Sequence, residues 1–206
     1  MTVNAPRPVP KSSVCSIARP PRRTQTNKMD DEPSSPTRTP GAPAGRLTID
    51  VLDTDRLLDA SDLSWLIDAT NRVCAQLPNT GEVRVCIVAD DRMRDAHQRY
   101  SALDTTTDVL TFDLAHDQPA DDSKVLDTDL FVCADEASRQ AQNREHDTKH
   151  ELLLYIIHGV LHCLGHNDQD NESFQKMHTR EDELLAGAGF GALFHTDTPT
   201  STGDQS

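Results

Sequence analysis

The most apolar segment of this chain is a predicted helix over residues 148–164, in which Leu, Ile and Val dominate. Its longest unbroken apolar run, 152–157, has six residues, and no longer run occurs elsewhere. A helix that spans a bilayer needs about 20 such residues. The segment is therefore expected to lie in the core of a folded domain, and we expect no membrane association.

Periodic patterns on both sides of this helix predict the other elements. Residues whose side chains alternate between apolar and polar predict strands, and apolar residues at helical spacing predict helices. The strands are expected at 47–51, 83–87, 108–112 and 126–133, and the helices from Ser61 or Asp62 to about 77 and over 90–100, 134–144, 148–164 and 171–186. The order β-α-β-α-β-β-α-α-α predicts an α+β layered fold, with a small mixed four-stranded sheet packed against helices.

Charge divides the chain into two parts at Arg46. Residues 1–46 hold 8 Lys and Arg against 3 Asp and Glu, a net of +5, while the other 160 residues hold 12 against 31, a net of −19. The first part also carries 9 of the 12 prolines and has little to bury, so it cannot offset the entropy cost of ordering. We expect a disordered basic, Pro-rich leader over 1–45, one domain over 46–190 and a polar tail over 191–206.

Cysteine usage and acidity narrow the class of protein further. The five cysteines are scattered and contain no C-x-x-C pair, which argues against a disulfide framework and against a Cys-based zinc site. A reducing compartment fits this usage, so we expect a cytoplasmic protein. Because the domain is strongly acidic, it repels a phosphate backbone in general, and any nucleic-acid role must depend on a local site.

Two histidines in the apolar helix predict a metal site. His158 and His162 are four residues apart, so their rings project from one face of the helix, one turn apart. Two imidazoles with this spacing bind one zinc ion in many proteins. In an otherwise Leu-, Ile- and Val-rich helix, unpaired imidazoles would be costly to bury. We therefore predict one Zn²⁺ per chain at this pair.

A third ligand is expected just after Gly165, a residue suited to end the helix and turn the chain. His166 and Asp168 are the two candidates. On a straight helix His166 would lie about 12 Å along the axis from His158, too far for one ion. With the helix broken at Gly165, Asp168 is better placed, and the pattern is H-x-x-x-H-x-x-G-x-x-D. Three protein ligands leave one tetrahedral position for water, as in catalytic zinc sites.

Other residues near this pattern are assigned no metal role. Zinc proteases of the H-E-x-x-H type use a glutamate as general base after the first histidine, and this chain has Gly159 there. His150 and His178 are expected on solvated helix faces. His166 is expected to orient a ligand, to face substrate or to lie at the surface. No general base is predicted, so the catalytic residue is unknown.

Three segments together resemble the YbeY family of bacterial endoribonucleases, which act as rRNA maturation factors. Residues 158–168 resemble the family's H-G-x-L-H-L-x-G-Y-D-H signature. Residues 107–112, with Asp104 before them, resemble its P-T-D-V-L-S-F strand, and 127–133 resemble its L-G-D-I-V-I-C segment. Met177 and Glu181 match the closing M-x-x-x-E helix. The resemblance extends over about residues 47–188.

The resemblance implies a zinc-dependent, single-strand-specific endoribonuclease in rRNA maturation, including processing of the 3′ end of 16S rRNA, and in ribosome biogenesis. Its implied partners are ribosomal RNA and the small ribosomal subunit. The chain departs from the family's pattern at four positions. Asp168 replaces the family's third histidine ligand, His166 its tyrosine, and Ser101 and Leu103 an arginine and a lysine thought to hold RNA. Two alternatives stay open, a metzincin-like zinc metalloprotease and a non-catalytic zinc-containing ribosome assembly factor.

Overall fold

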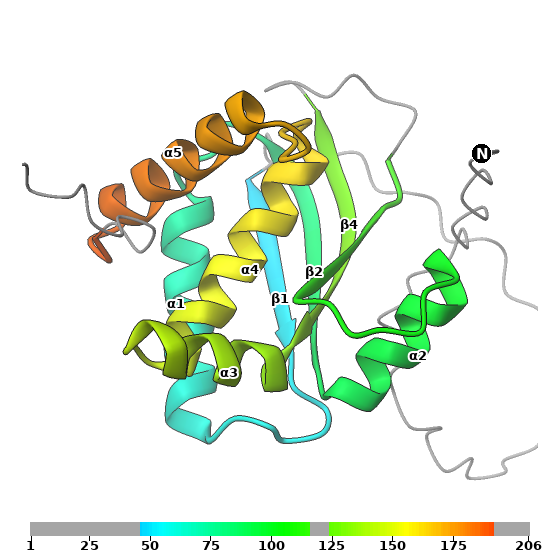
Figure 1. Cartoon of the computed structure of the whole chain (residues 1–206). Coiled ribbons are helices and arrows are strands. Elements are labelled where there is room, and N and C mark those ends of the chain that lie inside the picture. Colours follow the sequence, from blue (N-terminus) through cyan, green and yellow to red (C-terminus); the bar gives the residue numbers. More distant parts are fainter. Residues whose placement is uncertain (1–45, 116–123, 192–206) are drawn as a thin grey trace, which may run out of the picture.

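A computed structural model describes residues 46–115 and 124–191, which form one mixed four-stranded sheet with helices on both faces (Figure 1). The strands are β1 (Leu47–Leu52), β2 (Thr80–Val88), β3 (Val109–Asp113) and β4 (Val125–Cys133), in the spatial order β1-β2-β4-β3. The pairs β1·β2 and β2·β4 are parallel, and β3·β4 is antiparallel. The predicted α+β fold with a small mixed sheet is confirmed.

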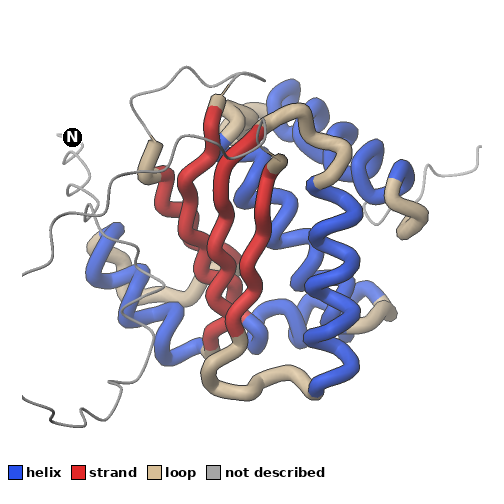
Figure 2. The backbone as a smooth tube through the Cα atoms, turned by 180° about the vertical axis from the view of Figure 1, so that it is seen from behind, coloured by secondary structure: helices blue, strands red, loops and turns tan. Residues whose placement is uncertain are grey.

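Five helices cover the sheet unequally. They are α1 (Ala60–Cys74), α2 (Asp90–Ser101), α3 (Ala134–Arg144), α4 (Thr148–Cys163) and α5 (Asn171–Gly187). From behind, the strands lie between α2 on one side and the other helices on the other (Figure 2). The two hydrophobic clusters follow this division, since the smaller one contains Met93 and Ala96 of α2 and the larger one contains the buried apolar side chains of α1, α4 and α5.

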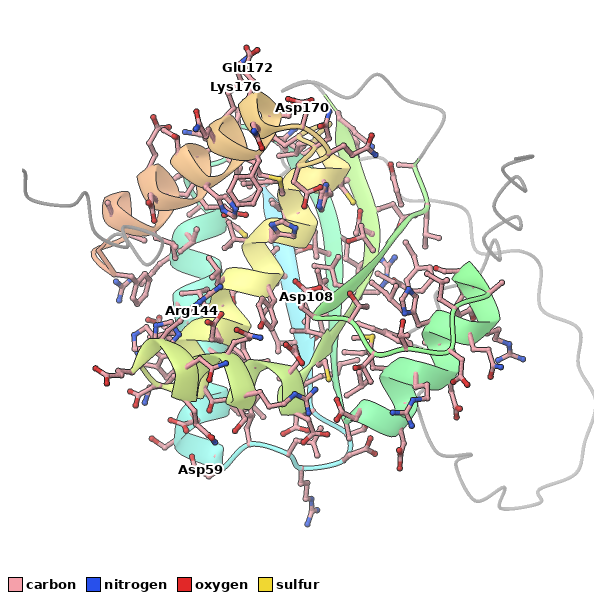
Figure 3. All side chains as sticks on the ribbon, viewed as in Figure 1. Asp59, Asp108, Arg144, Asp170, Glu172 and Lys176 are labelled. Atoms are coloured by element: carbon pink, nitrogen blue, oxygen red, sulfur yellow. The ribbon has the colours of Figure 1, made fainter. Side chains whose placement is uncertain are left out.

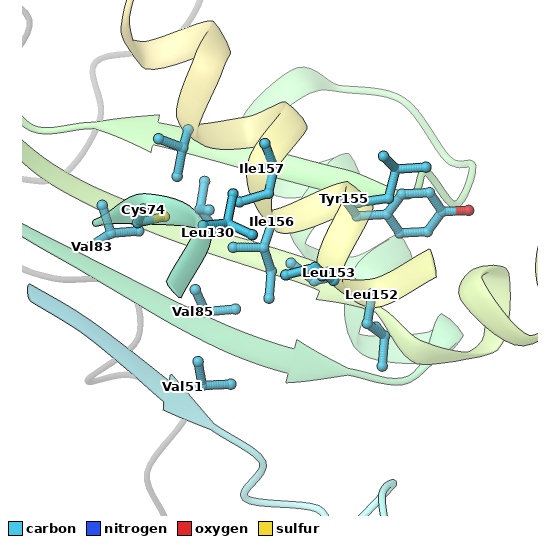
Figure 4. Packing of buried hydrophobic residues seen from close by; sticks show 14 of the residues in the cluster. Val51, Cys74, Val83, Val85, Leu130, Leu152, Leu153, Tyr155, Ile156 and Ile157 are labelled. Carbon is cyan, nitrogen blue, oxygen red and sulfur yellow. The ribbon is translucent and has the colours of Figure 1, made fainter. Parts of the chain in front are cut away.

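Helix α4 lies at the centre of the larger cluster. Its run Leu152–Ile157 is almost fully buried, with five of the six residues no more than 1% exposed. These side chains pack against strand residues such as Val85 and Leu130 (Figure 4). The helix contacts α1, α3, α5, β3 and β4. Because α4 is buried on nearly all sides, its sequence is apolar around its whole circumference. The same packing holds the helix in place, and with it the side chains that α4 directs toward solvent.

The C-terminus of α4 is closed by a backbone turn at Gly165, as predicted. Gly165 has a φ of +93°. Its N–H donates to the carbonyl of His162 at 3.0 Å, and the next N–H, of His166, donates to the carbonyl of Leu161 at 3.0 Å. This pair of bonds is the Schellman motif. The buried ammonium of Lys124 donates to the carbonyl of Cys163 at 2.8 Å, so the end of α4 is held from two directions.

Element ends differ from the sequence-based expectation by a few residues. Helix α1 begins at Ala60, because the carboxylate of Asp59 accepts from the N–H of Asp62, whereas Ser61 or Asp62 was the expected cap. It ends at Cys74 instead of near residue 77. Among the described residues no helix is both long and apolar enough to cross a membrane. The predicted leader (1–45) lies outside the described residues, as does the predicted tail (191–206) beyond residue 191.

Candidate metal centre

The two histidines of α4 point their outer ring nitrogens at each other. The Nε2 atoms of His158 and His162 are 2.9 Å apart, and the two rings are almost perpendicular. Beyond the first turn of α4, these are its two side chains that are not fully buried, being 15% and 29% exposed. The i,i+4 spacing therefore produces the convergence that the sequence predicts.

Asp168 joins this pair after the turn at Gly165. Its Oδ2 lies 3.7 Å from Nε2 of His158 and 4.0 Å from Nε2 of His162. These three residues form the one group of His, Cys, Asp and Glu side chains in the described ranges that could hold a metal ion. The side chain of His166, the other candidate for the third ligand, is not in the group.

The inner ring nitrogens of both histidines are already engaged. Nδ1 of His158 lies 2.8 Å from Oε1 of Glu181, a fully buried carboxylate on α5. Nδ1 of His162 lies 3.0 Å from the carbonyl oxygen of His166. Since a carbonyl only accepts, Nδ1 of His162 carries the proton, and a carboxylate likewise favours the proton on Nδ1 of His158.

This proton arrangement suits a cation. With both Nδ1 atoms protonated, each neutral ring directs the lone pair of its Nε2 atom toward the same point as the carboxylate oxygen of Asp168. These three acceptors repel one another unless a positive ion lies between them. Tetrahedral zinc with bonds of about 2.1 Å needs its ligand atoms about 3.4 Å apart. The three separations, 2.9, 3.7 and 4.0 Å, lie on both sides of that value, so the donor set fits a metal ion of this size.

Electrostatics around His158 also favour positive charge. Burial alone would lower the pKa of this histidine, but its hydrogen bond to the Glu181 carboxylate and the charges of Glu181, Asp108 and Asp168 outweigh burial and raise it. The nearby thiol of Cys163 behaves differently. It is buried, burial raises its pKa to about 11, and its sulfur is not in the metal group.

Comparison with known proteins identifies the family of this chain. The family model described as Endoribonuclease YbeY matches residues 52–189, about two thirds of the chain. The chain belongs to the YbeY endoribonuclease family. Relatives carrying that name include a protein of Carboxydothermus hydrogenoformans, 29% identical over 140 residues, which cover 68% of this chain and 92% of the relative. A protein of Staphylococcus epidermidis is 29% identical over 149 residues, 67% and 94% of the two chains.

More distant matches have similar coverage. A relative from Shouchella clausii, also named endoribonuclease YbeY, is 24% identical over 156 residues, 70% of this chain and 97% of its own. A protein of Thermotoga maritima with a solution structure is 25% identical and has a TM-score of 0.42, over 68% of this chain and 90% of its own. The chain thus includes nearly the full length of the three YbeY relatives from Carboxydothermus, Staphylococcus epidermidis and Shouchella.

A cleft of about 900 Å³ opens beside the metal group of this YbeY-family chain. His158 and Asp168 line it, together with residues from α3, α4 and α5 and Asp108 just before β3. Figure 3 shows Asp108 and Arg144 beside α4, on the strand and helix sides of this region. The metal group is therefore accessible to a ligand larger than water.

Gly159 faces the sheet and leaves no room for a longer side chain. A Cβ added there would lie 2.9 Å from Cδ2 of Leu130 and 3.2 Å from both Thr111 and Val109. A glutamate at this position would have to displace these side chains of β3 and β4. The protease pattern is therefore excluded here by packing as well as by sequence.

Two expectations about other histidines are wrong. His178 does not lie on a solvated face, since its ring is 18% exposed, lines the cleft and contacts Oε2 of Glu181 through Nδ1 at 2.6 Å. His150 packs edge-on against Trp65 at 4.7 Å. Sequence reasoning matched Glu181 to a family pattern but gave it no role. Its signal was a carboxylate among the apolar residues Met177, Leu184 and Leu185 that face the core.

Proposed function

We propose that this chain is a zinc-dependent, single-strand-specific endoribonuclease that acts in rRNA maturation and ribosome biogenesis, including processing of the 16S rRNA 3′ end. Residues 46–190 would form the hydrolase domain, acting in the cytoplasm on ribosomal RNA in association with the small ribosomal subunit. The observation that carries the proposal is the convergence of His158, His162 and Asp168 in a chain of the YbeY endoribonuclease family. Its relatives are named for ribonuclease activity.

In this proposal His158, His162 and Asp168 hold the metal, and the rest of the site keeps them in place. Glu181 and the carbonyl of His166 fix the two rings through their Nδ1 atoms, an arrangement that raises ligand basicity. The Schellman turn at Gly165 fixes where Asp168 enters. A zinc ion bound there would activate a water molecule or polarise the scissile phosphate.

The acidity of the domain is consistent with this role if the positive charge is local. Outside the metal group, the described lining of the cleft carries one cationic side chain, Arg144, whose guanidinium lies 2.7 Å from Oε1 of Glu151. The metal is then the main attraction for phosphate in the cleft. We therefore expect weak affinity for free RNA, with a ribosomal partner aiding recognition.

The two alternatives are weighed on specific residues. A metzincin-like protease would need a general base that Gly159 does not supply and for which α4 has no space. A non-catalytic zinc-containing assembly factor is favoured by Ser101 and Leu103, which stand where the family pattern has an arginine and a lysine. This second candidate keeps the metal group and predicts binding to ribosomal particles without cleavage.

One comparison separates these functions. The full-length protein, zinc-loaded or treated with EDTA, is incubated with single-stranded RNA, double-stranded RNA and casein, beside His162→Ala and His150→Ala. We expect cleavage of single-stranded RNA only, lost with EDTA and in His162→Ala. The His150→Ala variant should keep the activity, because His150 lies on the same helix but outside the metal group.

Each other outcome identifies a different function. RNA cleavage that persists in His162→Ala would contradict the proposal, since a contaminating nuclease would then explain it. Zinc-dependent cleavage of casein would favour the protease. Failure to cleave either substrate, combined with co-sedimentation with ribosomal particles, would favour the assembly factor.

A further inference from the structure

Phe174 on α5 is an exposed aromatic residue in the cleft beside the metal group. Five large hydrophobic residues of the described ranges are exposed, and Phe174 is the one aromatic among them, at 48%. The other four are Leu57, Ile67, Leu103 and Val125. None of these four lines the cleft beside the metal group, whereas Phe174 does. An exposed aromatic ring inside a cleft is a surface suited to a flat partner.

The ring of Phe174 is connected to the metal group by two ring contacts. It meets His178 at 4.0 Å between ring centroids, with the planes at 78°. His178 in turn lies 6.5 Å from His158 with nearly parallel rings. Because Glu181 contacts both His178 and His158 through its two oxygens, this side of the cleft is fixed to the same buried carboxylate as the metal group.

The charges of the cleft select which part of a nucleotide could lie on Phe174. Four carboxylates line the cleft, and its one cation, Arg144, is paired with Glu151. The carboxylates are Asp108, Asp168, Asp182 and Glu183. Away from the metal such a lining repels phosphate, but it tolerates an uncharged base, whose π-face can stack on an aromatic ring whatever its sequence.

We propose that Phe174 is the stacking platform of a nucleobase subsite, which holds one unpaired base of an RNA strand whose phosphate lies at the metal group. This inference rests on the proposed ribonuclease function and adds a specificity element to it. Only an unpaired base exposes its face to a protein ring, so the subsite selects single strands over duplexes. Stacking also supplies affinity that the acidic lining cannot.

Binding to a short, nuclease-resistant 2′-O-methyl RNA that contains 2-aminopurine tests the subsite, because the fluorescence of this base is quenched on stacking. The zinc-loaded protein is compared with Phe174→Ala, Phe174→Leu and Phe174→Trp, and with Ile67→Ala as a matched exposed hydrophobic outside the cleft. We expect roughly 5- to 100-fold weaker binding for Ala and Leu, with loss of quenching. Trp should bind at least as tightly as wild type, and Ile67→Ala should match it.

Several results would overturn the subsite. Unchanged affinity and quenching in Phe174→Ala would do so, and full affinity in Phe174→Leu would indicate an apolar docking surface for a peptide instead of a stacking platform. Unchanged zinc content and circular dichroism show that the variants fold. RNA cleavage is measured in parallel. If wild type cleaves and Phe174→Ala binds normally, the subsite alone is wrong. If wild type does not cleave but Phe174→Ala loses binding and quenching, the subsite stands without the nuclease.

Discussion

Two histidine pairs with the same i,i+4 spacing lie near opposite ends of α4, and only one of them belongs to a metal group. His146 and His150 flank the start of the helix, with ring centroids 6.3 Å apart. His158 and His162 lie near its end, with ring centroids 4.5 Å apart and Nε2 atoms in contact. Each pair has a fully buried glutamate beside it, Glu151 or Glu181.

The difference lies in what the second ring nitrogen contacts. At the C-terminal pair both Nδ1 atoms have partners, so both Nε2 atoms are directed to one point. At the N-terminal pair Nε2 of His146 lies 3.1 Å from Glu151 without a well-formed hydrogen bond, and Nδ1 of His150 is buried without one. A separation of four residues brings two rings close both on the helix and at its start, whereas hydrogen bonds donated by the far nitrogens decide whether the near nitrogens converge on an ion.

Replacing one histidine of each pair by alanine should give the largest difference between the pairs, in zinc content. His158→Ala removes one of three ligands, so we expect about one zinc per chain to fall to nearly none. His146→Ala leaves the metal group intact and should keep full zinc content. Elemental analysis of protein purified without chelator measures both. Wild-type protein without bound metal, or equal loss in the two variants, would contradict the assignment.

Replacing each of the two buried glutamates by glutamine should give the next largest difference, in zinc affinity. Glu181→Gln keeps the shape but replaces the carboxylate that orients His158 and His178. We expect zinc affinity to fall by about 10- to 100-fold, as for other residues that orient metal ligands. Glu151→Gln disturbs the contacts with Arg144 and His146, away from the metal group, and should leave zinc affinity unchanged. Competition with a chromogenic chelator gives both affinities, and equal values would show that Glu181 has no orienting role.

The sequence predicts the spacing and the turn of this site but not its supports. The i,i+4 histidines and Gly165 are local patterns, and the apolar run 152–157 places their helix in the core. Glu181 and His178 come from α5, and their approach to His158 depends on how α5 crosses α4. No local pattern encodes that crossing. The same limit explains the wrong expectation for His150, since its contact with Trp65 joins α4 to α1.

Gly159, which lies between His158 and His162 in the sequence, should show how tightly the metal-bearing half of α4 is packed. Ala is normally the better helix former by about 1 kcal/mol. Here its Cβ would lie 2.9 Å from Leu130, so we expect Gly159→Ala to lower the free energy of unfolding by about 1–3 kcal/mol. Urea denaturation in EDTA measures this without the metal contribution. A variant as stable as wild type, or more stable, would show that the side chains of β3 and β4 facing Gly159 can move away from α4.

The smallest expected effect is a pH dependence of stability that separates the two pairs. Burial lowers the pKa of His150 below its ordinary value of 6.5, whereas the pKa of His158 is raised. With His150 depressed in the folded state, the unfolded chain binds more protons as the pH falls below about 6.5. His150 therefore destabilises the folded protein on the acid side of that value, and the penalty disappears as the pH rises above it. Replacing it with Gln removes the penalty.

The test is the difference in unfolding free energy between His150→Gln and wild type, both in EDTA, followed from about pH 7.5 to about pH 5. We expect the difference to shift in favour of the variant as the pH falls. Lost packing against Trp65 changes stability equally at every pH, so it moves the whole curve but not its slope. A constant difference over this range would mean that His150 keeps an ordinary pKa. The two pairs would then differ only in hydrogen bonding and not in how each environment treats positive charge.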